Sequence, residues 1–227
     1  MRTVGIIQAR MGSTRLPGKV LFPLGKRTIL TYLVERLERS RTLDDIVVAT
    51  TGLSNDDAIV AECDKYSIPW FRGSEDDVLG RYLGAAIATD AEVVVRITAD
   101  NPFTDPESID RVVEYIGRTG ADYVLEDRLP LGTTGEALTG EMLAFLDEIA
   151  TEPDLREHVT LYAKRNRGPK SVFLEPPEAF DRPSLQLTVD ERSEYERVRE
   201  IAGRLGGLDF DLADLIQLAD QLVPALV

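Results

Sequence analysis

The sequence predicts an α/β fold with a mostly parallel sheet and helices on both faces. Two observations support this class. Over about the first 125 residues, short apolar segments alternate with segments whose apolar residues keep helical spacing. The strand-like segments are also apolar throughout, as in strands buried on both faces. In such folds ligands lie outside the carboxyl ends of the strands, so residues directly after each strand are the site candidates.

The first elements form a βαβ unit. Residues 4–7 are apolar and β-prone and predict the first strand, and residues 20–26 predict a short extended piece. Thr28 is a typical N-cap for a helix that continues to residue 37. Residues 46–49 are apolar without alternation and predict a second buried strand.

The same alternation continues to residue 125. Polar and acidic residues open the next two helices, and Pro106 occupies the first turn of the third, as is typical of helix N-termini. The predicted helices span 54–66, 74–89 and 106–117, and the predicted strands span 68–71, 92–98 and 122–125.

Glycines and prolines weaken the pattern between residues 126 and 183. We interpret the chain, 1–227, as one domain in which 126–183 is an insertion that covers a sheet edge and shapes an acceptor pocket. Beyond residue 126, the sequence predicts helices at 140–150, 155–165, 193–205 and 212–222 and strands at 171–174 and 185–189.

Composition narrows the partners. The net charge of −14 argues against DNA or RNA, because a phosphate backbone would be repelled. No run of about 18 apolar residues occurs and no signal peptide is recognised, so we expect no membrane span and a cytoplasmic location. Arg supplies 21 of the 26 cations, which together with the acidic excess resembles proteins of a salt-rich cytoplasm. The single cysteine, Cys63, is interpreted as a packed thiol.

The loop after the first strand carries three cations within ten residues. Arg10, Arg15 and Lys19 have about the charge that balances a nucleoside triphosphate, and Gly12 and Ser13 offer backbone N–H groups that a ligand can approach closely. The spacing is one residue too long for the P-loop pattern G-x-x-x-x-G-K-[ST]. A solvated basic turn without a ligand is the alternative.

Two carboxylates follow later strands. Asp100 comes directly after the strand at 92–98, and Asp190 follows the alternating segment 185–189. Two carboxylates together with phosphate oxygens suit Mg²⁺. Each also has a simpler interpretation, since Asp100 can make a turn and Asp190 can cap the next helix.

Several motifs, in this order, resemble the spore-coat polysaccharide cytidylyltransferase family of the SpsF type. More distantly, the chain is similar to the CMP-KDO and CMP-sialate synthetases. The motifs are QARMGSTRLPGKV at 8–20, VVATT at 47–51, FRGSEDDVL at 71–79, RY at 81–82, VRITADNP at 95–102, DP at 105–106 and REHVT at 156–160.

The resemblance implies a nucleotide-diphospho-sugar transferase fold of glycosyltransferase A type, dependence on Mg²⁺ and CTP as the nucleotide donor. It implies transfer of a cytidylyl group to a sugar or sugar acid, giving an activated CMP- or CDP-sugar and pyrophosphate, and a possible homodimer formed through 126–183. By position, Asp100 and Asp190 match the metal ligands, and Arg15, Lys19 and Asp100 the catalytic groups. The residues that match the nucleotide site are Ala9, Arg10, Gly12, Ser13, Arg15, Lys19, Arg72, Asp77 and Arg81.

Some positions depart from the family pattern, and they lie on the acceptor side. Asn101 stands where Cys is usual, and Gln186 where Arg is common. The role of His158, the only histidine, stays open between a base and a structural residue. Asp77 and Arg81, four apart on one helix, could equally form a surface ion pair. Two other functions remain: a glycosyltransferase, which would normally carry an Asp-x-Asp motif, and a non-catalytic nucleotide-binding relative.

Overall fold

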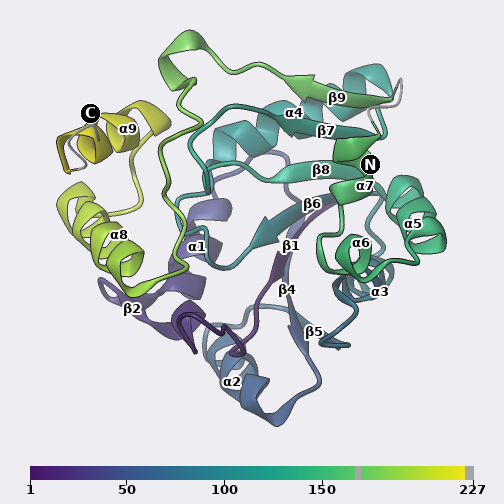
Figure 1. Cartoon of the computed structure of the whole chain (residues 1–227), viewed down its shortest axis with the longest axis horizontal. Helices are drawn as coiled ribbons and strands as arrows, with labels where there is room; N and C mark the ends of the chain where they lie inside the picture. The colour runs from purple at the N-terminus through teal and green to yellow at the C-terminus, as the bar shows by residue number, and fades with distance from the viewer. Residues whose placement is uncertain (167–169, 223–227) are drawn as a thin grey trace.

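The computed structural model describes residues 1–166 and 170–222, so 167–169 and 223–227 of the predicted single domain lie outside the described residues. Its centre is a seven-stranded sheet in the order β5-β4-β1-β6-β8-β7-β9 (Figure 1). The strands are β1 Thr3–Gln8, β4 Asp45–Thr51, β5 Trp70–Gly73, β6 Val93–Thr98, β7 Tyr123–Glu126, β8 Glu136–Thr139 and β9 Ser171–Leu174. A separate hairpin pairs β2 Pro23–Leu24 with β3 Arg27–Thr28.

The register of the sheet brings the carboxyl ends of three strands together. β1 is parallel to both β4 and β6, and Gln8 is level with Ala49 on one side and Thr98 on the other. β5 is parallel to β4, whereas β8 is antiparallel to β6 and β7. The predicted fold class, a mostly parallel sheet flanked by helices, is confirmed.

Helices cover both faces of the sheet. Ile and Leu side chains of α1, α2 and α4 pack on one face, and side chains of α3, α5 and α7 pack on the other. A further cluster joins α1 to α8 and α9. The helices are α1 Ile29–Leu37, α2 Asp57–Lys65, α3 Val78–Ala88, α4 Pro106–Thr119, α5 Gly140–Ile149, α6 Pro153–Glu157, α7 Leu161–Arg165, α8 Arg192–Leu205 and α9 Leu212–Leu222.

Local signals fix several helix starts where the sequence predicted them. Thr28 caps α1 through a capping box with Thr31, whose backbone N–H donates to the Thr28 hydroxyl at 3.2 Å. Asp105 caps α4 by accepting from the Ser108 N–H at 2.9 Å, and Pro106 follows at the first helical position. None of the helices among the described residues is long and apolar enough to cross a membrane.

Two predictions about regular structure are wrong. The helix expected at 155–165 is divided into α6 and α7, because Val159 has a φ of 46° in the left-handed region and ends the helical path. The segment 185–189 is not a regular strand. Gln186 forms only an isolated bridge with Leu131, and the Val189 N–H donates to the Asp100 carbonyl.

Residues 126–183 contribute more to the sheet than an edge cover. They contain β8, a strand that the sequence did not reveal, which lies between β6 and β7, and β9, which was predicted. At 20–26 the expected extended piece is confirmed only at β2, Pro23–Leu24, because the chain before it forms a 3₁₀ turn, Lys19–Leu21, that leads into the β2–β3 hairpin. The acceptor-binding and dimerisation roles of 126–183 stay predictions.

Candidate functional site

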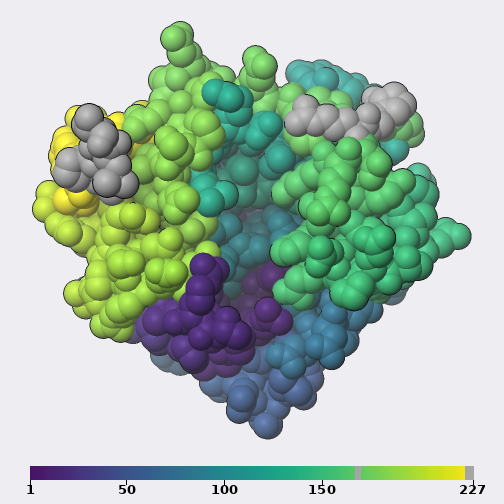
Figure 2. Space-filling model, in the orientation of Figure 1, coloured from purple at the N-terminus to yellow at the C-terminus, as the bar shows by residue number. Residues whose placement is uncertain are grey.

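A cavity of about 330 Å³ opens over the carboxyl ends of β1 and β6. Figure 2 shows this hollow between the purple N-terminal segment, the green segment that includes α6 and the yellow-green segment before α8. Its lining residues are Gln8, Ala9, Arg10, Gly12, Ser13, Thr14, Arg15, Lys19, Val20, Arg81, Arg96, Thr98, Ala99, Asp100, Glu157, His158 and Asp190.

Lys19 joins the two predicted carboxylates at the cavity. Its Nζ donates to Asp100 Oδ2 at 2.7 Å and to Asp190 Oδ1 at 2.8 Å, although these residues are far apart in sequence. Arg15 Nη2 lies 3.1 Å from the same oxygen of Asp190. Partial burial would raise the pKa of Asp190, but hydrogen bonding and positive charge from Lys19 and Arg15 outweigh it and lower this pKa below its usual value.

The loop between β1 and α1 is built to present Lys19 to these carboxylates. Gly18 has a φ of 73°, a left-handed conformation that glycine adopts without strain, and it turns the chain into the 3₁₀ turn that carries Lys19. Asp56 holds the other end of the loop by accepting from the Met11 N–H at 2.7 Å. The Ser13 hydroxyl accepts from the Leu16 N–H at 3.2 Å, which keeps the loop compact.

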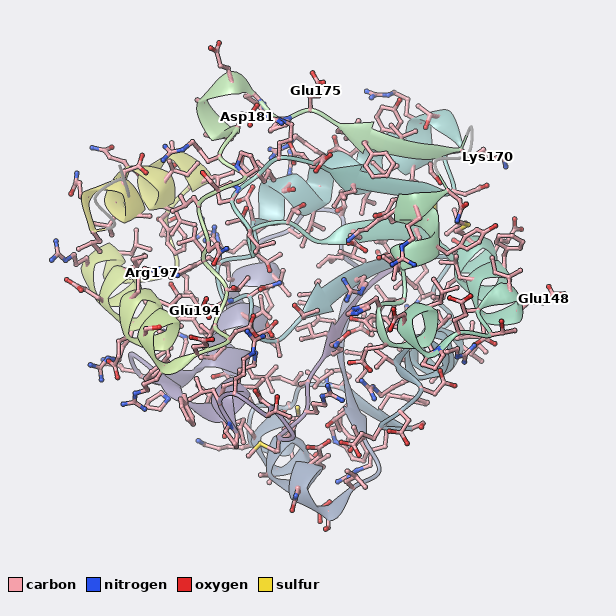
Figure 3. The ribbon with its side chains drawn as sticks, viewed as in Figure 1. Glu148, Lys170, Glu175, Asp181, Glu194 and Arg197 are labelled. Carbon is pink, nitrogen blue, oxygen red and sulfur yellow. The ribbon has the colours of Figure 1, made fainter. Side chains whose placement is uncertain are left out.

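The two carboxylates reach the cavity from different supports. Asp100 lies in a turn after β6, where the Asn101 N–H donates to the Thr98 carbonyl at 3.1 Å. Asp190 precedes α8 and is not its cap, because Glu191 occupies the N-cap position. Glu194, on the first turn of α8 (Figure 3), accepts from the Asp190 N–H at 2.6 Å and so fixes the backbone at this point.

Two further cations, Arg10 and Arg81, line the cavity beside Arg15 and Lys19. Arg10 Nη2 donates to Glu157 Oε1 at 3.2 Å, which ties the N-terminal loop to the end of α6. Arg81 is 2% exposed and donates to the Ser74 carbonyl. Burial lowers the pKa of Arg81.

Two predicted nucleotide-site residues lie outside the cavity. Arg72 donates to the Thr51 carbonyl at 3.0 Å and pairs with Asp57. Asp77 caps α3 and pairs with Arg156, so the ion pair with Arg81 considered from the sequence is not formed. Both residues support elements around the site.

Sequence reasoning missed several lining residues, among them Gln8, Arg96, Thr98 and Glu157. Gln8 and Thr98 could have been found, since both end strands at the predicted binding edge. Three lining residues carry a buried polar atom without a hydrogen-bond partner among the described residues: Gln8 Oε1, an acceptor, and Arg81 Nε and Arg96 Nε, both donors.

The carboxylates of Asp100 and Asp190 could hold a hard divalent cation only if a bound small molecule supplied further oxygen atoms. Among residues 1–166 and 170–222, no three His, Cys, Asp or Glu side chains gather as a complete metal site. Asp100 and Asp190 nevertheless converge on one Nζ atom, and two carboxylates completed by phosphate oxygens and water are the usual protein contribution to a Mg²⁺ site. The lining therefore suits a metal-bound polyphosphate.

Fold and cavity together define an α/β protein with a cavity, lined by cations and carboxylates, at the carboxyl edge of its sheet. A family model described as cytidylyltransferase matches residues 4–214, and the chain belongs to this family.

Two relatives match over nearly the whole chain, and a third matches over part of it. An uncharacterised protein of Methanocaldococcus jannaschii is 42% identical over 97% of this chain and 91% of its own length. The spore coat polysaccharide biosynthesis protein SpsF of Bacillus subtilis is 40% identical over 95% of this chain and 93% of its own. The 3-deoxy-manno-octulosonate cytidylyltransferase of Bdellovibrio bacteriovorus is 28% identical over 72% of this chain and 63% of its own length. The resemblance to the SpsF type is thereby confirmed.

Solved structures agree with this assignment. A cytidylyltransferase from Leptospira borgpetersenii has a TM-score of 0.91 at 33% identity, covering 98% of this chain and 95% of its own. A CMP-KDO synthetase in complex with CTP, with a TM-score of 0.68 at 15% identity, covers 90% of this chain and 100% of its own. A Mycobacterium tuberculosis protein in complex with manganese has a TM-score of 0.61 at 16% identity, covering 88% of this chain and 99% of its own. The last two show the shared fold.

Proposed function

We propose that this protein is a Mg²⁺-dependent sugar cytidylyltransferase. It would transfer a cytidylyl group from CTP to a sugar or sugar acid, releasing pyrophosphate, in surface polysaccharide or glycan biosynthesis. The observation that carries the proposal is the contact of Lys19 with both Asp100 and Asp190 beside a loop that also bears Arg10 and Arg15. Family membership supports nucleotidyltransfer, and the name of the Bacillus relative supports the polysaccharide context.

The proposed roles follow from charge and position. Arg10, Arg15 and Lys19 would bind the triphosphate, with the Gly12 and Ser13 backbone close to the phosphates. Asp100 and Asp190 would hold Mg²⁺, which when bound supplies charge neutralisation at the phosphates. Alignment of the acceptor oxygen with the α-phosphorus and neutralisation of charge would provide most of the rate enhancement, without a dedicated base.

The choice of donor and metal also draws on proteins of this fold. The CMP-KDO synthetase was solved with CTP, and the mycobacterial protein with manganese, another hard divalent cation. We place the acceptor on the side of 126–183, where Asn101 and Gln186 depart from the family pattern. The sugar is therefore the part of the reaction to be found by experiment.

The test is an assay for pyrophosphate with CTP or UTP, MgCl₂ and a panel of sugars, sugar acids and sugar phosphates. We expect release that needs CTP, metal and one acceptor class. Asp100→Asn should abolish it, whereas Asp209→Asn, the same change at a carboxylate that is 95% exposed, should not. Unchanged turnover of the Asp100 variant would remove this residue from the mechanism, and CTP binding without turnover on any acceptor would favour a non-catalytic binding protein.

A further inference from the structure

Arg156, on α6, makes extensive side-chain ion pairs next to the cavity. Its Nη2 lies 2.6 Å from both carboxylate oxygens of Asp77, and its Nε donates to Asp77 Oδ1 at 2.9 Å. The same guanidinium reaches Asp147 Oδ1 at 2.7 Å and the Asp147 carbonyl at 3.0 Å. A planar guanidinium that holds one carboxylate through two nitrogens fixes orientation as well as distance.

Asp77 has two functions at once. Its Oδ1 accepts from the Gly80 N–H at 2.9 Å and so caps α3, while both its oxygens bind Arg156. Burial would raise the pKa of Asp77, but the hydrogen bonds from Arg156 and Gly80 lower it below its usual value. One carboxylate therefore joins the start of α3 to α6.

The two residues after Arg156 both line the cavity. Glu157 binds the Arg10 guanidinium, and His158 lies in the same wall. α6 has only five residues, too few to be stable by itself, and the chain leaves it through Val159 in a left-handed conformation that a β-branched residue rarely adopts. Contacts with other parts of the chain must therefore hold Glu157 and His158 in place.

We propose that the Arg156–Asp77 ion pair is a positioning device for the reaction. It holds Glu157 and His158 against the N-terminal loop, so that the Arg10 guanidinium is aimed into the cavity before a triphosphate arrives. Arg156 and Asp77 act through Glu157 and Arg10 and do not touch the nucleotide. The expected effect on CTP binding rests on the proposed function. The expected effect on the position of Glu157 and His158 does not.

The variants separate the ion pair from the helix cap. Asp77→Asn keeps an N-cap acceptor of about equal quality for Gly80 but removes the charge that binds Arg156. Arg156→Gln removes the other partner, and the double variant shows whether the two act as a unit. Arg182→Gln is the matched control, since Arg182 is similarly part-exposed and pairs with Asp220 away from the cavity.

Two measurements follow. The first is the affinity for CTP with MgCl₂ by calorimetry and the KM for CTP, which we expect to weaken by roughly 10- to 100-fold because a displaced binding group costs about this much. The second is the imidazole resonance of His158 by NMR without nucleotide, which is unambiguous because the chain has one histidine. We expect it to shift in Asp77→Asn and Arg156→Gln and to stay in place in Arg182→Gln.

The outcomes distinguish this inference from the proposed function. Equal losses in both single variants, with no further loss in the double variant, would support a single positioning unit. A His158 resonance unmoved in both variants would overturn it, as would wild-type affinity for CTP in the double variant. Should the wild type bind no CTP, the proposed function would fall, and the His158 resonance alone would still decide whether the ion pair positions the wall.

Discussion

Replacing Lys19 by methionine tests how the cavity is held together. The Lys19 side chain is 8% exposed and is the shared partner of Asp100 and Asp190. Without it two carboxylates lie close together and lose their common cation. Two unit charges about 4 Å apart interact by roughly 4 kcal/mol near a protein surface. Because the Asp100 and Asp190 side chains are 27% and 33% exposed, solvent screens part of this energy.

We expect Lys19→Met to lower the free energy of unfolding by about 2 kcal/mol near neutral pH, which corresponds to a fall in Tm of roughly 4–8 °C for a chain of this size. The loss should depend on pH. Asp190 has a lowered pKa in the folded protein, so its ion pairs stabilise the fold above its usual pKa of 3.8 and are lost as the pH falls through the lower folded value. The difference between wild type and variant should therefore be full near neutral pH and shrink under acid conditions.

Calorimetric and urea unfolding at several pH values, with and without MgCl₂, measure these quantities. Two carboxylates freed from Lys19 should accept a hard cation, so MgCl₂ should raise the Tm of the variant more than that of the wild type. Lys26→Met, the same change at an exposed lysine, is the control. The reasoning would be refuted by equal losses in the two variants, or by a Lys19→Met loss that neither acid nor MgCl₂ reduces.

Two further predictions concern positions away from Lys19. Gly132 has a φ of 94°, and a Cβ there would lie 2.9 Å from Thr188 Cγ2. Gly132→Ala should therefore lower the free energy of unfolding by about 1–3 kcal/mol, whereas Gly203→Ala, in a helix with open space, should raise it by up to about 1 kcal/mol, and urea unfolding compares the two. Burial raises the pKa of the Cys63 thiol to about 12. A thiol-specific disulfide reagent at about pH 8 should label Cys63 only as fast as the chain opens, and rapid labelling of the native protein would contradict its burial.

The sequence predicted the elements whose causes are local. The apolar run at β1 and the caps Thr28 and Asp105 each lie within a few residues of the element that they define. The same is true of the basic loop, where the charges and the turn at Gly18 are encoded together. The prediction that Asp100 and Asp190 share one site depended on the predicted fold as well as on local sequence. Only the order of strands in the sheet brings the end of β6 to the loop after β1.

The failures have causes outside the local sequence. Residues 155–165 keep helical spacing, but Val159 takes a left-handed conformation and the next residue, Thr160, hydrogen-bonds to Glu136 of β8. β8 itself is short and is stabilised by pairing on both sides, which its own sequence does not reveal. Asp77 had a plausible partner at helical spacing in Arg81, yet it binds Arg156, which is distant in sequence.

The charges around the cavity explain how a strongly acidic chain would bind the triphosphate that we propose. The cations of the N-terminal loop already have carboxylate partners: Arg10 has Glu157, Arg15 has Asp190, and Lys19 has both Asp190 and Asp100. A triphosphate bound as we propose would exchange with these carboxylates, because each cation that turns to a phosphate leaves an acidic group without its partner. Asp100 and Asp190, which share Lys19, would then be the pair most in need of a new cation. The same two residues are the proposed metal ligands, so the charge balance of the cavity and the proposed need for a divalent metal would have one physical origin.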